Sequence, residues 1–500
     1  MTMAVKALAS EQMTRIVDGG SVAGIRIDGI DKFLSIPYAA PPVGRNRFRE
    51  GQPVEPWDGV RDATRAGPTS WYKSPVFPGL DIEPLIGPGG TGGDGYLTVN
   101  VWAPKGAAKC PVMVWIHGGA FVLGSKDATV SDCTAFAQSG IVCVAIGYRL
   151  GIDGFLPIPG VPTNLGLRDI IAALHWVRRN VAQFGGDPDN VTAFGESAGA
   201  MALSALITSP LAKGLFQRAI VQSGHGAMVR DIPTAGRLVR KLAKMLKIRP
   251  DVAGFRTVDF ATGWAAMERI GKPFVRLDLR DEAGHEPVFG ISRFVPVYGD
   301  DVLPQKPHDA LRVGAGAEID VLIGTNAEEM NFYFIPTKVR QKIPGWLARW
   351  MLRKSHPTAR RTLKAYGHGE KPAGHAYTDA MNDLVFRWPA RRFAEEHQGR
   401  THFYEFDWRS PRYDGQFGSA HGMELPFVFK TLPAVTGSDG LVGENPPADL
   451  ADKIHRIWVA FATDGTLPWA EFDRDHRNVR LLGSERTIDE PPMPAAPYLP

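Results

Sequence analysis

The sequence predicts an α/β protein with a large, mostly parallel central sheet that carries helices on both faces. Several short runs rich in β-branched residues are almost continuously apolar, which is typical of strands covered on both sides. Segments with apolar residues at helical spacing lie between these runs, and strands that alternate with helices indicate an α/β sheet. Hydrophobic residues make up 44% of the 500 residues and charged residues 22%, a balance that allows a large buried core.

Six runs are the expected strands of this sheet, and the last of them is expected to be the last good strand of the chain. They are residues 112–118, 141–149, 191–197, 218–224, 319–326 and 401–408. The clearest helix covers residues 164–186, where leucine, isoleucine and valine recur on one face. Gly185 and Gly186 offer a stop at its end.

Residues 230–293 and 330–400 are rich in helix-forming residues and poor in strand patterns. We therefore expect two helical insertions within a single domain that spans residues 1–500. Within the second insertion, residues 342–354 place two tryptophans near several basic side chains. This segment could contact a membrane, form a lid over a site, or be an ordinary surface helix with a packed aromatic face. The ordinary surface helix is the preferred interpretation.

Composition excludes several classes of protein. A net charge of +4 over 500 residues gives little support for a nucleic-acid partner. The N-terminus lacks the pattern of a secretory signal, and no stretch of about 18 residues is apolar throughout, so no membrane span is predicted. The three cysteines, Cys110, Cys133 and Cys143, fit no metal site and are expected to be free thiols. Free thiols indicate a reducing compartment, and we predict a cytoplasmic location.

One serine lies between two glycines where a strand pattern passes directly into a helix pattern. The motif is Gly195-Glu196-Ser197-Ala198-Gly199. On such a strained turn the serine hydroxyl points outwards, and glycine two positions away on each side avoids a collision. The first N–H groups of the following helix suit a developing negative charge. Ser197 is therefore predicted to be a nucleophile, with Glu196 as a supporting residue beside it.

A serine nucleophile needs N–H donors for the acyl oxygen, a base, and an acid that orients the base. The donors are expected in His117-Gly118-Gly119-Ala120, which follows a strong strand run. Adjacent glycines let the backbone turn its N–H groups into a site. We assign Gly118 and Gly119 as donors, together with the N–H of Ala198. His117 itself is expected to be structural.

Among the 13 histidines, His421 is the best candidate for the base. It follows the expected last strand, and the usual chain order is serine, then acid, then histidine. An unperturbed histidine titrates near pH 6.5, so activity is expected to rise with a midpoint at roughly pH 6–7. Glu328 and Glu329 follow the strand run 319–326, and spacing alone does not separate them as candidates for the acid. Both could also belong to a solvated helix N-terminus.

Blocks of the sequence, taken in order, resemble the type-B carboxylesterases, the cholinesterase-like branch of the α/β-hydrolases. The similarity runs from about residue 24 to residue 473. The blocks are SIPYAAPPVGRNRF, NVWAP, WIHGGAF, GYRLGIDGFL, NLGLRD, FGGDPDNVTAFGESAGA, GLFQRAIVQSG, LIGTNAEE and AHGMELPFVF. The resemblance implies the α/β-hydrolase fold, with the helical insertions over the active site.

The resemblance also implies roles for particular residues. The acid of the family is the last residue of a Gly-Thr-Asn-x-x-Glu block, which selects Glu329. The serine of the QSG block supports that acid, which makes Ser223 a supporting residue. Two ion pairs are implied as well, and they join Arg149 to Asp169 and Arg47 to Asp94.

Three departures from the family pattern are visible. Tyr96 stands where the family often has a disulfide-forming cysteine, which agrees with an intracellular protein. Met330 stands where a glycine often follows the acid, so the pocket wall is expected to differ. Residues 80–93 contain no tryptophan where cholinesterases carry one that binds choline, which argues against choline esters.

These features together imply a serine carboxylesterase that hydrolyses small-molecule carboxylic esters through an acyl-enzyme. No metal or organic cofactor is implied. An amide- or carbamate-hydrolysing relative is the first alternative, because the same groups serve both reactions. A non-catalytic ligand-binding or adhesion relative is the second, and the retained Ser197, Glu329 and His421 argue against it. The sequence leaves open the natural substrate and whether the protein is a monomer or a dimer.

Overall fold

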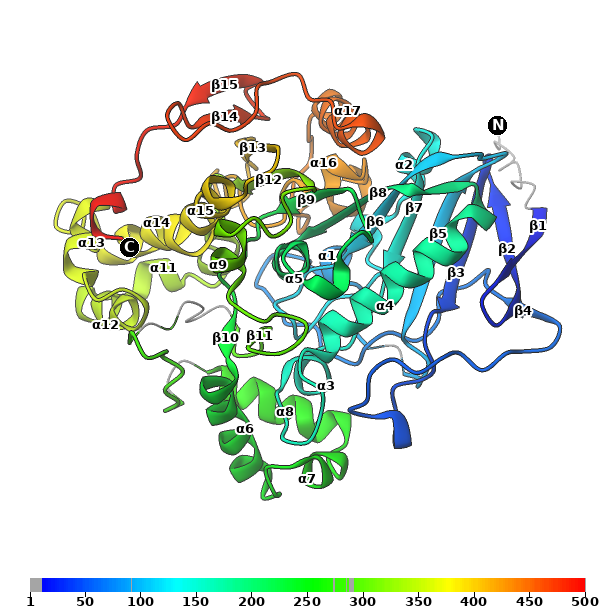
Figure 1. Ribbon diagram of the computed structural model, residues 1–500. Coiled ribbons are helices and arrows are strands. Elements are labelled where there is room, and N and C mark those ends of the chain that lie inside the picture. Colours follow the sequence, from blue (N-terminus) through cyan, green and yellow to red (C-terminus); the bar gives the residue numbers. More distant parts are fainter. Residues whose placement is uncertain (1–10, 91, 273–274, 285, 287–291, 500) are drawn as a thin grey trace.

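The computed structural model describes residues 11–90, 92–272, 275–284, 286 and 292–499 (Figure 1). In this part of the chain a single sheet holds 13 strands. Seven adjacent strands of this sheet are parallel, and the first six of them correspond to the six predicted runs. In spatial order they are β7 (Val142–Ile146), β6 (Cys110–Ile116), β8 (Gly186–Glu196), β9 (Arg218–Gln222), β12 (Asp320–Asn326) and β13 (Thr401–Phe406). The predicted α/β fold with a mostly parallel sheet is therefore confirmed.

Further strands extend the sheet at both edges. An antiparallel series joins β7 on one side, made of β5 (Thr98–Pro104), β3 (Ile30–Pro37), β2 (Gly20–Ile27) and β1 (Glu11–Val17), and β4 (Val60–Asp62) pairs with β2. On the other side β14 (Asn478–Leu481) and β15 (Arg486–Asp489) follow β13. The expectation that residues 401–408 form the last strand is therefore wrong. The two added strands are short and carry charged residues, as edge strands often do, which weakens their sequence signal.

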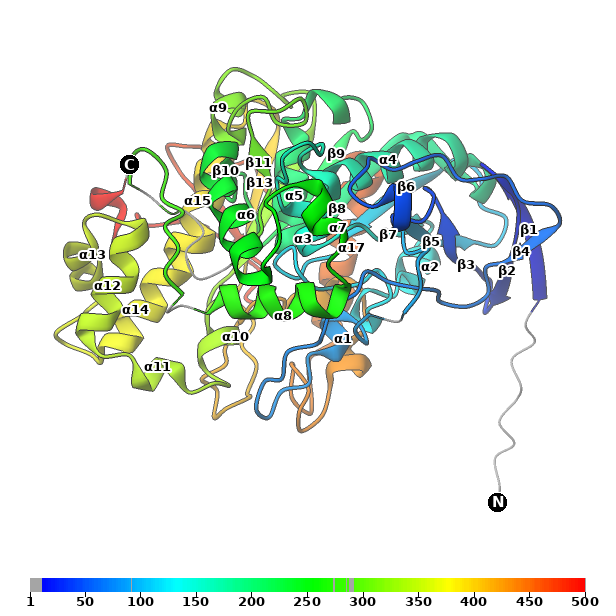
Figure 2. The same cartoon turned by 90° about the horizontal axis from the view of Figure 1, so that it is seen from below.

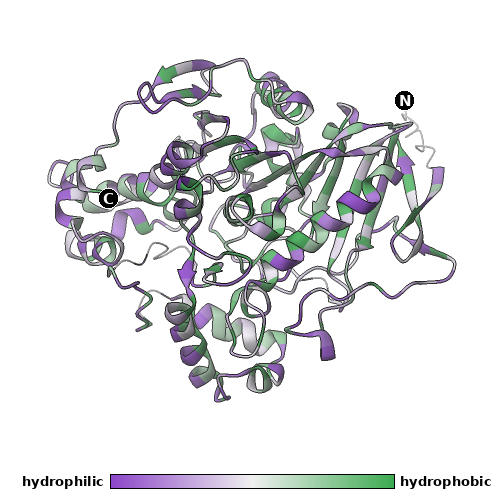
Figure 3. Cartoon of the chain, in the orientation of Figure 1, coloured by the Kyte–Doolittle hydropathy of each residue, from purple (hydrophilic) through white to green (hydrophobic). Residues whose placement is uncertain are grey.

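The parallel strands are apolar on both faces because helices cover both faces (Figure 3). In β6, Val112, Val114 and Ile116 pack on the side of α4 (Leu165–Asn180) and α5 (Ala198–Ile207). Met113 and Trp115 alternate with them and pack on the opposite side, against the phenylalanines and tryptophans of α2 (Thr134–Gln138), α16 (Leu425–Val428) and α17 (Ala448–Asp464). This period-two alternation between two buried faces explains why the runs read as continuously apolar.

The two predicted insertions are helical in the described residues. The first contains α6 (Ile232–Leu246), α7 (Val252–Arg256) and α8 (Phe260–Gly271), and β10 (Arg230–Asp231) pairs with β11 (Val297–Tyr298) at its base. Each of its helices starts with an aspartate whose carboxylate accepts a backbone N–H of the first turn. Such caps contribute about 1 kcal/mol each. The second contains α10 (Asn331–Phe334), α11 (Val339–Lys342), α12 (Gly345–Ser355), α13 (Ala359–Ala365), α14 (Ala373–Asn382) and α15 (Trp388–Glu396).

The predicted helix over residues 164–186 is confirmed with a sharper end. Regular α4 stops at Asn180, and a 3-10 turn follows over Val181–Phe184. Gly185 then takes a left-handed conformation (φ 80°), and β8 begins at Gly186. The remaining short helices of the described chain are α1 (Glu83–Ile86), α3 (Gly151–Phe155) and α9 (Pro307–Arg312).

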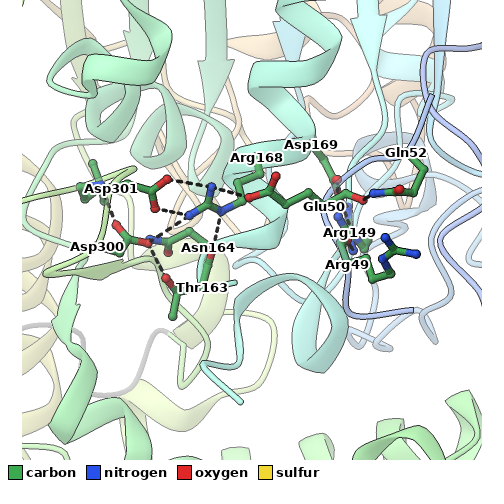
Figure 4. A network of polar contacts seen from close by, with 11 residues as sticks. Arg49, Glu50, Gln52, Arg149, Thr163, Asn164, Arg168, Asp169, Asp300 and Asp301 are labelled. Carbon is green, nitrogen blue, oxygen red and sulfur yellow. Dashed lines mark hydrogen bonds and ion pairs between the residues drawn. The ribbon is translucent and has the colours of Figure 1, made fainter. Parts of the chain in front are cut away.

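One of the two implied ion pairs is present, and the other is not. Figure 4 shows Arg149 against Asp169, with Nε and Nη2 of the arginine 2.7 and 2.6 Å from the two carboxylate oxygens, both side chains being buried. The expected pair between Arg47 and Asp94 is wrong. Asp94 is exposed, and Arg47 instead binds Asp153 of α3, with Nε 2.7 Å from Oδ1.

The expectations about the cysteines, about a membrane span and about residues 342–354 have different outcomes. Cys110, Cys133 and Cys143 are free, as predicted. None of the helices in the described ranges is long and apolar enough to cross a membrane. The preferred interpretation of residues 342–354, a helix with a packed aromatic face, is wrong. The helix exists as α12, but Trp346 and Trp350 are 66% and 43% exposed, because its buried side consists of small and aliphatic residues.

Candidate active site

Ser197 lies at the junction of β8 and α5 in a strained conformation, with φ 55° and ψ −123°. A non-glycine residue held there costs roughly 1–3 kcal/mol, which the surrounding packing must supply. A Cβ atom on Gly195 would come within 2.8 Å of the carbonyl oxygen of Ile116, and one on Gly199 within 2.0 Å of the same oxygen. The predicted need for glycine on both sides of the serine therefore arises from the close approach of β6.

Ser197, His421 and Glu329 form one continuous chain of hydrogen-bonding groups. Nε2 of His421 lies 2.8 Å from Oγ of Ser197. Nδ1 of the same ring lies 2.6 Å from Oε2 of Glu329. The three residues follow the carboxyl ends of β8, β13 and β12, and all three are buried. The structure therefore brings together the three residues that the sequence analysis selected.

Further bonds fix the orientation of the carboxylate and the ring. The backbone N–H of Asn326 donates to Oε1 of Glu329 (2.8 Å), and the N–H of His421 donates to the carbonyl of Glu329 (3.2 Å). Glu328 points away, and its Oε2 accepts from the N–H of Ser419 (3.0 Å) and from Arg409. The geometry separates the two adjacent glutamates, which their spacing could not.

The expected donor loop runs beside Ser197. A Cβ atom on Gly118 would lie 3.1 Å from Cβ of Ser197, and Gly119 has φ 111°. Within the described residues, the backbone N–H groups of Gly118, Gly119 and Ala198 donate to no other group. They are therefore available to bind a negatively charged oxygen next to the serine.

Contacts with Tyr148 and Ser292 hold this loop in place. The ring of His117 stacks on Tyr148 at 4.4 Å, and burial lowers the pKa of His117 to about 4, which agrees with its expected structural role. Ala120 (φ 54°) also takes a left-handed conformation. Its carbonyl oxygen lies 2.8 Å from Oγ of Ser292, which comes from the end of the first insertion. Nothing in the sequence indicated this contact, because it joins segments 172 residues apart.

Glu196 is buried next to the same imidazole. Its Oε1 lies 3.1 Å from Nε2 of His421. Burial raises the pKa of Glu196 to about 8. Burial alone would lower the pKa of His421, but attraction by Glu196 and Glu329 outweighs it and raises this pKa to about 9. The expected midpoint at roughly pH 6–7 assumed an unperturbed histidine, and these two carboxylates favour a higher one.

A buried cluster of polar side chains behind the site, formed by Asn326, Glu424 and Gln222, was missed by the sequence analysis. Nδ2 of Asn326 donates to Oε2 of Glu424 (2.7 Å) and to the carbonyl of Ala420 (2.8 Å), next to His421. Nε2 of Gln222 donates to Oε1 of Glu424 (3.1 Å). The sequence signal for this cluster was Asn326, a polar residue at the end of an apolar strand, since a buried polar group requires partners.

Ser223 does not form the expected bond to Glu329. Its backbone N–H donates to the carbonyl of Gly324 (2.8 Å). Its buried Oγ has no hydrogen-bond partner among the described residues. Oε1 of Glu329 accepts the backbone N–H of Asn326.

A mainly apolar pocket opens onto Ser197. It has a volume of about 770 Å³ including its open mouth. Aliphatic and aromatic side chains from α1, α10 and α16 line it, among them Leu85, Ile86, Phe332, Tyr333 and Leu425. Phe386 also packs on the His421 ring at 4.9 Å. In the described ranges no cluster of His, Cys, Asp and Glu side chains is arranged to hold a metal ion. The aliphatic and aromatic lining of the pocket suits an uncharged organic ligand.

Known proteins resemble this chain along most of its length. Residues 11–487 match the model of the carboxylesterase family. The para-nitrobenzyl esterase of Bacillus subtilis (strain 168) is 34% identical over 490 residues, which cover 95% of each chain. Liver carboxylesterase of Sus scrofa is 32% identical over 509 residues, covering 90% of this chain and 84% of that one. A solved structure of a PNB esterase superposes with a TM-score of 0.81 at 30% identity, covering 98% of this chain and all of the other.

Proposed function

Because this chain belongs to the carboxylesterase family and is a carboxylic ester hydrolase, we propose that Ser197, His421 and Glu329 are its catalytic triad. The observation that carries the proposal is the unbroken contact from Oγ of Ser197 through both ring nitrogens of His421 to Oε2 of Glu329. A serine hydroxyl is a weak nucleophile until a base takes its proton, and the imidazole lies within reach to do so.

In the proposed reaction Oγ of Ser197 attacks the ester carbonyl while Nε2 of His421 takes the hydroxyl proton. Glu329 stabilises the imidazolium that results. The N–H groups of Gly118, Gly119 and Ala198 bind the oxyanion of the tetrahedral intermediate. The alcohol leaves with the proton from His421, and a water molecule repeats the sequence on the acyl-enzyme. Glu196 lies beside Nε2 of the base and influences its protonation, and Ser223 lies behind the site without a direct bond to the triad.

The substrates we propose are uncharged esters with apolar groups. The aliphatic and aromatic lining of the pocket supports this, since buried apolar area drives the binding of such ligands. The name of the Bacillus subtilis relative, a para-nitrobenzyl esterase, supports the same class. A panel of esters, amides and carbamates of matched size would establish which acyl derivatives are hydrolysed.

The domain organisation of the enzyme and its location in the cell are also proposals. We propose that residues 1–500 form one domain with helical insertions over the active site at about 230–293 and 330–400. We further propose a cytoplasmic location, which the buried free thiols of Cys133 and Cys143 support, because thiols persist in reducing compartments.

The test of the triad is the Ser197→Ala variant. With a p-nitrophenyl ester, the wild-type enzyme should release a burst of p-nitrophenol followed by steady turnover, and the variant should lose several orders of magnitude in kcat. Ser223→Ala is the matched control, because it removes a buried hydroxyl that lacks a bond to the triad. Near-normal turnover by a pure Ser197→Ala preparation would refute the proposed mechanism.

A further inference from the structure

Part of the second insertion is strongly basic, although the chain as a whole is nearly neutral. The full sequence is nearly neutral, with a net charge of +4. Residues 330–369 contain no aspartate or glutamate, but they contain nine lysines and arginines. These are Lys338, Arg340, Lys342, Arg349, Arg353, Lys354, Arg360, Arg361 and Lys364. The segment covers α10 to α13, so nine positive charges are concentrated in one helical part of the molecule.

One face of α12 combines these charges with exposed indole rings. Trp346, Arg349, Trp350 and Arg353 follow the spacing i, i+3, i+4 and i+7, which places them on one side of the helix. All four are exposed. The helix buries Ala348 and Leu352 on its other side, where it packs on α13 and α14. The tryptophans are thus not part of the protein core.

Most cations of this surface form no ion pair within the described residues. Seven of the nine are exposed, and none of these seven forms an ion pair within the described chain. They are Lys338, Lys342, Arg349, Arg353, Arg360, Arg361 and Lys364. Nζ of Lys354, an eighth cation, lies 4.3 Å from the ring centre of Trp350. Apolar side chains lie beside the indoles, since Val339 is exposed and Leu347 and Met351 are half-buried.

We propose that α11, α12 and α13 form a docking surface for anionic phospholipid bilayers. Indole rings favour the interface between lipid and water, and lysine and arginine are attracted to anionic headgroups. A helix with these two groups on one exposed face lies in the plane of such an interface. The aliphatic residues beside the tryptophans favour a lipid surface over a nucleic acid, because a phosphate backbone gives them nothing to bury against.

The proposed docking surface begins close to the active-site pocket along the chain. The chain passes from α10, whose Phe332 and Tyr333 line the pocket, into α11 after only a few residues. Figure 2 shows α10 and α11 along the same lower edge of the molecule. Apolar esters partition into lipid, so an enzyme held there meets its substrates at a raised local concentration.

The experiment is flotation of the whole protein with vesicles. One set contains about one third phosphatidylserine in phosphatidylcholine, and the other contains phosphatidylcholine alone. We expect binding to the anionic set only, and we expect it to weaken as salt shortens the screening length from about 10 Å at 0.1 M to about 3 Å at 1 M. Arg349→Gln with Arg353→Gln should weaken binding about 25-fold, at roughly fivefold per charge. Trp346→Ala with Trp350→Ala should weaken it at least about tenfold.

A matched control removes two exposed arginines elsewhere. Arg65→Gln with Arg486→Gln changes the net charge equally but lies outside the insertion, and its binding should stay within about twofold of wild type. Thermal unfolding by circular dichroism checks that every variant is folded. Equal binding to both vesicle sets, or an equal loss in the control, would overturn the proposal. Binding to duplex DNA that is as tight as binding to vesicles and independent of the two tryptophans would overturn it as well.

Discussion

Oε1 of Glu196 lies 3.1 Å from Nε2 of His421, the same nitrogen that faces Oγ of Ser197. The proposed base therefore has a carboxylate on each side, Glu196 at Nε2 and Glu329 at Nδ1. Both favour the protonated ring, and their attraction raises the pKa of His421 to about 9 against the opposing effect of burial. A base must be neutral to accept a proton, so this arrangement moves the onset of activity to higher pH.

The first prediction concerns that onset. Because the pKa of His421 is raised, kcat/KM should rise with pH along a curve whose midpoint lies above pH 6.5. Glu196→Gln removes one attracting charge, so the pKa of His421 should fall and the midpoint should move to lower pH by about one unit or more. The pH dependence of kcat/KM on one activated ester measures this shift. Since Glu196 and His421 titrate together, the midpoint belongs to the pair. An unchanged midpoint in the variant would contradict the assignment.

The second prediction separates the adjacent glutamates. Glu329→Gln removes the charge that stabilises the imidazolium, and kcat should fall at least about 10²-fold, compared with about 10⁴-fold in a related triad. Glu328→Gln should cost less than about tenfold, because Glu328 bonds Arg409 and the N–H of Ser419 and not the ring. Measuring kcat for both variants on one ester decides the matter, and a larger loss for Glu328→Gln would reject Glu329 as the acid.

The third prediction concerns Ser292 as a positioning residue. Ser292→Ala removes the partner of the Ala120 carbonyl, so the donor loop should lose part of its fixed geometry. We expect kcat to fall about tenfold with little change in KM, and a boronic acid that mimics the tetrahedral intermediate should bind correspondingly more weakly. Ser292→Thr keeps the hydroxyl and should restore most of kcat. If the threonine variant behaves like the alanine variant, the hydroxyl is not the cause.

The fourth prediction tests the corrected ion pair by stability. Asp153→Asn leaves Arg47 with a half-buried charge and no carboxylate partner, and it should cost about 3 kcal/mol or more in the free energy of unfolding. Asp94→Asn should have little effect, because Asp94 is exposed. Urea unfolding followed by tryptophan fluorescence compares the two variants. Equal losses would mean that Asp94 contributes to a pair after all.

The sequence predicted the centre of the fold better than its edges. The central runs were recognisable because Val112 and Met113, one residue apart, are buried on opposite faces, so no polar residue interrupts the strand. Most residues of β15 are polar and exposed, so its sequence pattern resembles that of a loop.

In the site, sequence order and motifs identified the reacting groups but not their supports. Two contacts depend on three-dimensional proximity, which a single sequence does not reveal. They join Ser292 to Ala120 and Asn326 to Glu424. The choice between Glu328 and Glu329 depends on the direction in which each side chain leaves the strand end. The resemblance implied two ion pairs, of which Arg149 with Asp169 is present, whereas Arg47 binds Asp153 because α3 brings that carboxylate within reach.

Ser197 and His421 touch although 224 positions separate them along the chain. During synthesis the nucleophile therefore leaves the ribosome long before its base exists, and β13, whose carboxyl end precedes His421, forms later still than β8. A chain that ends before residue 421 holds Ser197 but lacks the proposed base, so it should hydrolyse no ester. Ester hydrolysis by this protein thus reports that translation has passed residue 421, and a selection for its activity is also a selection against chains that end earlier.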